Sequence, residues 1–163
     1  MLSWEATKMK LYLIQHGLAK SKGEDPNRPL NEQGWAETKK IATLIATVGN
    51  IKPSKIIHSG KTRARQTAEI IAEHLELSNK LEQVSDMAPM DDPSIWLGKI
   101  KGYKEDIMLV GHLPHLAKLA GNILVKNEDS NIVRFRNSGI VCLERDENGT
   151  WSIAWFVGPQ VLP

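Results

Sequence analysis

The sequence has few of the features that would assign a chain to a specialised class. Its one cysteine, Cys142, cannot form an internal disulfide and lies in an alternating stretch typical of a packed core. Its hydrophobic runs, such as 107–110, are far shorter than the roughly 20 residues that span a bilayer. Residues 1–8 lack the apolar core and small-residue cleavage site of a secretory signal. We therefore expect a cytoplasmic protein without a membrane segment.

The net charge is also small, which argues against a nucleic-acid partner. The chain has 21 Lys and Arg residues against 19 Asp and Glu residues, a net charge of +2. With 41% hydrophobic and 25% charged residues, its 163 residues have the composition of one globular domain. Basic residues are nevertheless concentrated in one stretch that has no acidic residue and contains Lys52, Lys55, Lys61, Arg63 and Arg65. Such a stretch indicates either a local anion site or a solvated face.

Segments with strand and helix patterns alternate along the chain. The patterns predict strands over 10–15, 54–59, 81–84 and 106–110, and helices over about 31–48, 62–77, 93–100 and 114–126. Asn31 is the expected N-cap of the first helix, and Gly49-Asn50 its expected end. Strands over 139–145 and 150–157 form a closing hairpin. We predict an α/β fold, a three-layer α/β/α sandwich whose mostly parallel sheet has an antiparallel edge strand and a C-terminal hairpin.

Polar clusters follow three of the predicted strands. In such folds ligands bind beyond the carboxyl ends of the strands, so these clusters are expected to converge. They are Gln15-His16-Gly17, then His58-Ser59 followed by Arg63, and Gly111-His112. The helices that begin after the second and third clusters add backbone N–H groups and positive dipole ends, which favour a phosphate. The sequence therefore predicts a phosphate-binding pocket.

Other phosphate and metal chemistries fit the residues poorly. Ser59-Gly60-Lys61-Thr62 is similar to the end of a Walker A loop, but the first glycine of that loop would fall at Lys55, inside a strand. Cys142 lies within a hairpin strand, not at the strand-to-helix turn of a cysteine phosphatase. His16, His112 and His115 lack further ligands at zinc spacing. We therefore expect neither a metal nor a cofactor.

Four ordered motifs resemble the histidine phosphatase superfamily, which has the phosphoglycerate mutase-like fold, and in particular its small SixA-like phosphohistidine phosphatase branch. The motifs are Leu11-Tyr12-Leu13-Ile14-Gln15-His16-Gly17, Arg28-Pro29-Leu30-Asn31-Glu32-Gln33-Gly34, the stretch from Ser59 to Ala68, and Val110-Gly111-His112-Leu113-Pro114. With the closing hairpin they extend over residues 10 to about 157. The resemblance implies one domain over 1–163, with residues 1–8 as an N-terminal extension.

The resemblance also implies roles for individual residues. His16 would be the nucleophile, forming a phosphohistidine enzyme that water then hydrolyses. Arg63 and His112 would hold the phosphoryl oxygens, and Arg28 would border the same pocket. Asp86 stands where the wider superfamily has the acid that protonates the leaving oxygen, with Asp91 and Asp92 nearby, and each of these could instead be a loop or cap residue.

One position departs from the family pattern. The arginine that precedes the nucleophile in the family is Gln15 here. Glutamine keeps an amide donor for the phosphate but loses the charged bidentate fork, whose hydrogen bonds contribute roughly 1.5–3 kcal/mol each. We expect this change to affect catalysis more than phosphate binding.

The function that the resemblance implies is a metal-independent phosphatase acting on phosphohistidine in a protein, such as a phosphorelay or phosphotransfer domain. Its partner would be that phosphorylated protein, with no nucleic acid and no membrane involved. Two alternatives remain open. One is a phosphatase of small phosphomonoesters, and the other is a catalytically weak or silent phosphate- or phosphoprotein-binding module, which Gln15 suggests.

Overall fold

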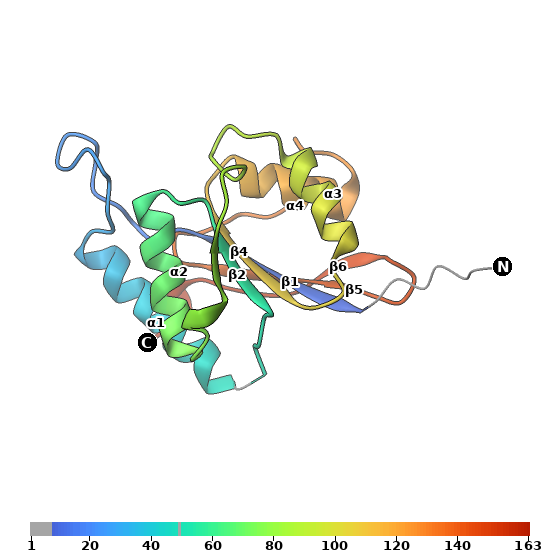
Figure 1. The fold of residues 1–163 in the computed structure, drawn as a ribbon, viewed down its shortest axis with the longest axis horizontal. Coiled ribbons are helices and arrows are strands. Elements are labelled where there is room, and N and C mark those ends of the chain that lie inside the picture. The colour runs from blue at the N-terminus through green and yellow to red at the C-terminus, as the bar shows by residue number, and fades with distance from the viewer. Residues whose placement is uncertain (1–7, 49) are drawn as a thin grey trace.

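The computed structural model describes residues 8–48 and 50–163, so most of the expected N-terminal extension and Gly49 lie outside the described residues. A six-stranded sheet has the strand order β3-β2-β4-β1-β5-β6 (Figure 1). The strands are β1 Met9–Gln15, β2 Lys55–His58, β3 Leu81–Gln83, β4 Ile107–Gly111, β5 Ile140–Arg145 and β6 Trp151–Val157. The helices are α1 Glu32–Val48, α2 Thr62–His74, α3 Pro93–Gly102 and α4 His115–Val125, with short 3-10 helices at Ser78–Lys80 and Pro159–Val161.

The pairing of the strands confirms the predicted sheet. β3, β2, β4 and β1 are mutually parallel neighbours, whereas β5 pairs antiparallel with β1. β6 pairs antiparallel with β5 and forms the edge, so the C-terminal hairpin closes one side of the sheet. The parallel neighbours need long crossover connections, which the helices between them supply, whereas the short turn at 146–150 permits only an antiparallel pair.

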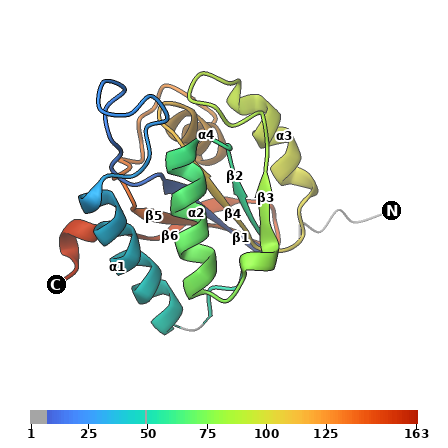
Figure 2. The ribbon, with the colours of Figure 1, turned by 60° about the vertical axis from the view of Figure 1, so that its left-hand side comes forward.

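Helices cover both faces of the sheet, which explains the apolar runs in its central strands. Tyr12 and Ile14 of β1 belong to one buried cluster, and Leu11 and Leu13 to the other. α1 and α2 lie side by side in front of the sheet in Figure 2, and α3 and α4 pack together on its other face. Alternate residues of one strand thus enter two different cores, because successive side chains of a strand point to opposite faces. Cys142 is a buried core residue, as predicted.

The predicted helices are present, with a difference at one end. α2 ends at His74, before the predicted Leu77, because Glu76 adopts a left-handed conformation with φ of 58°. No glycine marks this end, so the sequence pattern does not show it. None of the described helices has the length and hydrophobicity to cross a bilayer.

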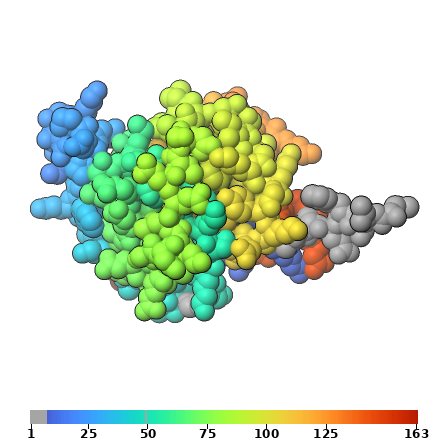
Figure 3. All heavy atoms as spheres, viewed as in Figure 1, coloured from blue at the N-terminus to red at the C-terminus, as the bar shows by residue number. Residues whose placement is uncertain are grey.

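The loop between β1 and α1 projects from the body of the molecule and returns across the start of α1 (Figures 1 and 3). The Asn31 side chain caps α1 by accepting a hydrogen bond from Gly34 N at 2.8 Å, as predicted for an N-cap. A Cβ atom at Gly34 would lie 2.0 Å from the carbonyl oxygen of Leu18. Gly34 therefore allows the incoming loop to contact the first turn of α1 at backbone distance.

We expect Gly34→Ala to lower the free energy of unfolding by about 1–3 kcal/mol, although alanine favours helix formation, because its methyl group must displace the Leu18 backbone. Gly98→Ala is the matched control, since Gly98 is exposed within α3 and a Cβ there meets nothing within 4 Å. This control should gain about 0.5–1 kcal/mol. Urea denaturation of both variants measures the difference. Equal effects of the two substitutions would contradict the backbone contact.

Candidate active site

Three predicted site residues meet at the carboxyl ends of adjacent strands. His16 follows β1, His112 follows β4, and Arg63 lies in the first turn of α2. The rings of His16 and His112 have centroids 4.9 Å apart at an interplanar angle of 54°. Arg63 Nε donates a hydrogen bond to His16 Nε2 at 3.2 Å. The convergence expected from the strand ends is therefore present for these three side chains.

The hydrogen bonds of His16 define its tautomer. His16 Nδ1 lies 2.7 Å from the carbonyl oxygen of Gly17. A carbonyl oxygen only accepts, so Nδ1 carries the proton and Nε2 keeps a lone pair. Burial lowers the pKa of His16 to about 4. The hydrogen bond to the Gly17 carbonyl raises this pKa, and the charges of Arg63 and Arg28 lower it further. His16 is thus a neutral imidazole at pH 7, with its Nε2 lone pair facing the Arg63 guanidinium.

His112 is held in a second buried position. Its side chain is 1% exposed, and its Nε2 lies 2.5 Å from the Ser59 hydroxyl oxygen. Burial lowers its pKa to about 3, with smaller contributions from His16 and the charge of Arg63. Its Nδ1 is buried and has no hydrogen-bond partner within the described chain. His112 is therefore also neutral at pH 7, and Ser59 sets the orientation of its ring.

Several positioning residues escape prediction from the sequence. Thr67 Oγ1 accepts from Gly17 N at 3.0 Å and donates to the Arg63 carbonyl at 2.7 Å, which joins α2 to the segment after His16. Asn137 Nδ2 donates to the His16 carbonyl at 2.9 Å. Thr67 lies one helical turn after Arg63, so its spacing is a usable signal. Ser59 belongs to a polar cluster that the sequence predicts at the site, whereas Asn137 is joined to the site by a tertiary contact that no local pattern shows.

The start of α2 adds donors to the site. Its N-cap, Lys61, forms no side-chain cap, and the preceding Gly60 has φ of 83°, a conformation that glycine adopts without strain. First-turn N–H groups of an uncapped helix, together with the positive end of its dipole, favour an anion. The strand-to-helix turn that carries Ser59 and Arg63 is therefore suited to a phosphate.

Arg28 and Gln15 lie at the border of this cluster. Arg28 Nε donates to the Lys20 carbonyl at 3.2 Å, and its charge lowers the pKa of both His16 and Arg63, although burial is the larger cause for each. The Gln15 side-chain oxygen is buried without a hydrogen-bond partner among the described residues. Phosphate contact by either residue stays a prediction.

Asp86 and His58 form hydrogen bonds with residues other than His16, Arg63 and His112. Asp86 accepts hydrogen bonds from Trp96 Nε1 at 2.9 Å and from Lys99 Nζ. Partial burial raises the pKa of Asp86, but the hydrogen bonds from Lys99 and Trp96 outweigh it and leave the pKa below its usual value. The ionised Asp86 carboxylate, which accepts two hydrogen bonds, is suited to a structural role rather than to donating a proton. His58 is 5% exposed, and its Nδ1 accepts from Gly60 N at 3.2 Å, so its ring supports the turn before α2.

The described residues form no cluster of potential metal ligands. Within residues 8–48 and 50–163 no three His, Cys, Asp or Glu side chains are placed to hold a metal ion. His115 is fully buried, and neither of its ring nitrogens has a hydrogen-bond partner in that part of the chain. Burial also raises the pKa of Cys142 to about 12, which keeps its thiol protonated and unreactive.

The comparisons with known proteins assign the chain to a class of phosphatases. Residues 11–88 match the family described as Histidine phosphatase superfamily (branch 1). The chain belongs to this superfamily, as the sequence motifs predicted.

Individual relatives agree with this assignment. The chain is 30% identical over 142 residues to an uncharacterized protein of Picosynechococcus sp. (83% of this chain, 84% of the relative). It is 23% identical over 156 residues to the phosphohistidine phosphatase SixA of Escherichia coli (93% and 94%). The solved structure of the protein histidine phosphatase SixA complexed with tungstate is 22% identical and has a TM-score of 0.80, covering 93% of this chain and 98% of that one. The structural likeness shows a shared fold, and the family membership supports a phosphatase.

The buried, neutral His16 makes stability depend on pH. In the unfolded chain a histidine binds a proton as the pH falls through about 6.5, whereas folded His16 does so near 4. The unfolded state therefore binds more protons between these values, and stability falls as the pH is lowered. From pH 7 to pH 5 we expect His16 to account for a loss of about 1–2 kcal/mol. Denaturant unfolding of wild type and His16→Gln at both pH values measures it, and an identical pH dependence would contradict this assignment.

Proposed function

We propose that this protein is a metal-independent phosphatase that removes the phosphoryl group from phosphohistidine in a protein, such as a phosphorelay or phosphotransfer domain. The observation that carries the proposal is the neutral His16, whose Nε2 lone pair faces the Arg63 guanidinium. The proposal includes the cytoplasmic location expected from the sequence.

In the first step His16 Nε2 attacks phosphorus. The Nε2–P bond forms as the P–N bond of the substrate breaks, and the substrate imidazole leaves. If that imidazole is protonated before cleavage, it departs as a neutral ring and needs no separate acid. A step without a separate acid agrees with the hydrogen bonds that Asp86 accepts from Lys99 and Trp96, because these bonds keep Asp86 ionised. In the second step water attacks the phosphoenzyme, which returns free His16 and inorganic phosphate.

Arg63 and His112 act on the phosphoryl oxygens in this scheme. The Arg63 guanidinium exchanges its hydrogen bond to His16 Nε2 for bonds to the entering oxygens, which releases the lone pair for attack. The uncapped start of α2 adds backbone donors. A phosphoryl dianion near His112 favours the protonated form of its ring, against the burial that keeps it neutral in the free protein.

A protein substrate suits the surroundings of the site. β3 and α3 are joined by residues 84–92 alone, which is too short a segment for a domain that would enclose a small molecule. The Escherichia coli relative is a phosphohistidine phosphatase, which supports the same substrate class. Small phosphomonoesters are therefore the weaker alternative.

The phosphoenzyme provides the direct test. Brief incubation with a small phosphodonor should label wild type with a bond that is stable in base and labile in acid, and His16→Ala should carry no such label. Turnover should persist in EDTA and fall at least a thousandfold in His16→Ala, since the variant has no nucleophile.

Label that remains in His16→Ala would contradict histidine catalysis. Wild-type turnover equal to that of His16→Ala, with phosphate binding that is lost in Arg63→Ala, would instead identify a silent binding module.

Gln15→Arg tests the departure from the family pattern. The buried Gln15 amide oxygen has no partner among the described residues, and an arginine there would add charged donors beside His16. We expect kcat/KM to rise about tenfold to a hundredfold, as one charged hydrogen bond allows. Gln15→Lys is the control that adds charge without the bidentate fork and should gain less. No gain from either change would show that another cation, such as Arg28, already supplies the charge.

A further inference from the structure

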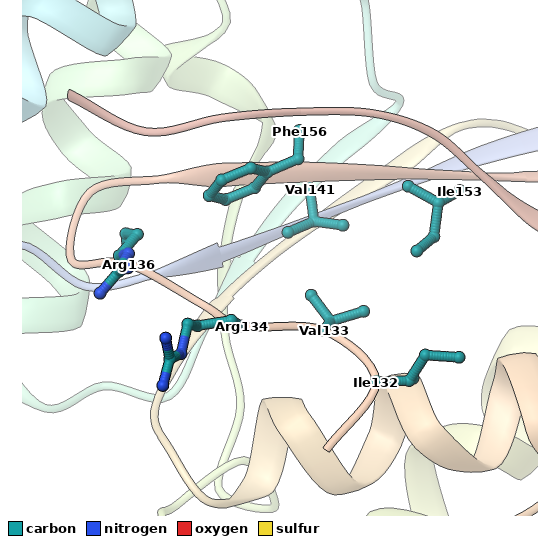
Figure 4. A pocket seen from close by; sticks show the side chains of 7 residues that line it. All are labelled: Ile132, Val133, Arg134, Arg136, Val141, Ile153 and Phe156. Carbon is teal, nitrogen blue, oxygen red and sulfur yellow. The ribbon is translucent and has the colours of Figure 1, made fainter. Parts of the chain in front are cut away.

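An apolar groove opens beside the edge strand, on the face of the sheet that carries α4 (Figure 4). We call it the β6 groove. It has a volume of about 310 Å³. Its apolar wall consists of Ile132, Val133, Val141, Ile153 and Phe156, and Arg134 and Arg136 line one end. Three of these apolar side chains are almost half exposed: Ile132 at 48%, Ile153 at 46% and Phe156 at 45%. Large apolar side chains gathered in one exposed patch are typical of an interaction surface.

A β-bulge produces this groove. Cys142 pairs with Trp155, and Leu143 pairs with Ile153, so Ala154 is an extra residue in β6. In a regular strand Ile153 and Phe156 would point to opposite faces, because they are three positions apart. The bulge places both on the face of Leu143 and Val141, their partners in β5. Two large apolar side chains therefore share one exposed face.

The charge of the groove is of one sign. Arg134 and Arg136 are exposed, and none of the described residues that line the groove is acidic. Within the described chain neither guanidinium forms an ion pair. Both are at the surface, where a carboxylate of another molecule can reach them. An apolar side chain flanked by carboxylates is the surface that complements this arrangement.

The arginine end of the groove adjoins the active site. Asn137, the residue after Arg136, donates a hydrogen bond to the His16 carbonyl at 2.9 Å. Ser138 N donates to the Gln15 carbonyl at 3.0 Å. Figure 4 shows both arginines near the carboxyl end of β1, the faint blue strand, whereas Ile132 and Ile153 lie at the other end of the groove. A macromolecule that presents a phosphoryl group to His16 therefore lies next to the groove.

We propose that the β6 groove binds the protein substrate of the phosphatase, through an apolar side chain flanked by carboxylates close to its phosphohistidine. This inference rests on the proposed function. A second copy of the chain fits the groove less well. Packing of groove on groove would bring the arginines of two copies together, and β6 has no charged residue to offer in return.

The test compares two substrates with the same reacting group: free phosphohistidine, and a histidine-phosphotransfer domain phosphorylated on histidine. The variants are R134E/R136E, which reverses the charge, and I153S/F156S, which removes the apolar wall. K101E/K104E is the control with the same change in net charge, since both lysines are exposed and lie before the amino end of β4, away from the active site.

We expect both groove variants to hydrolyse free phosphohistidine within about twofold of wild type. On the phosphorylated domain their kcat/KM should fall at least tenfold, mainly through KM, whereas the control variant should retain wild-type values. Added salt should raise KM for the domain in wild type and much less in R134E/R136E, because the arginine contacts are electrostatic.

The remaining outcomes separate this inference from the proposed function. Wild type that hydrolyses neither substrate faster than His16→Ala would refute the phosphatase itself. Wild type that prefers the domain, with groove variants that keep the preference, would refute the docking surface alone. Equal kcat/KM of wild type on the two substrates would also refute the docking surface. Light scattering that shows a wild-type dimer, absent in I153S/F156S, would assign the groove to a second copy.

Discussion

The parallel pairing of β1 with β4 is the constraint on which the site depends. Leu11 to Gln15 pair in register with Ile107 to Gly111, so both strands end at the same level of the sheet. His16 N then donates to the Gly111 carbonyl at 3.0 Å, which extends the pairing one residue beyond the strands. Two histidines that are distant in sequence thereby lie in contact with tilted rings, and α2 needs only to supply Arg63 beside His16.

This placement has an energetic cost within the protein. Buried polar atoms without a partner among the described residues gather around these strand ends: Gln15 Oε1, His112 Nδ1 and both ring nitrogens of His115. A buried polar atom that stays without any hydrogen-bond partner costs about 1–3 kcal/mol of stability. The partly buried Arg63 guanidinium adds a further cost, since neither neutral imidazole beside it carries a charge that could pair with it. Apolar packing of the central strands on both faces has to offset these terms.

Local chemistry made most of the fold predictable. Apolar runs bounded by turns identified the strands, Asn31 identified the start of α1, and strand ends followed by polar residues identified His16, Arg63 and His112. The rest depends on contacts between distant segments. Asn137 lies beside Gln15 and reaches the His16 carbonyl, Ser59 orients His112 through a tertiary hydrogen bond, and Asp86 is held by Trp96 and Lys99. The end of α2 at His74 depends on the left-handed conformation of Glu76, and the bulge at Ala154 depends on the register of β6 with β5, and neither is marked by a glycine or proline.

The bulge at Ala154 also bears on self-association. β6 is an edge strand of seven residues, Trp-Ser-Ile-Ala-Trp-Phe-Val, without a charge. Its β-branched and aromatic content and its unpaired backbone groups are those of a template for strand addition and amyloid-like stacking. A bulge bends the strand and interrupts the regular spacing of its free N–H and C=O groups, so another flat strand cannot pair along its whole length. An extra residue of this kind is a device by which edge strands avoid pairing with another chain.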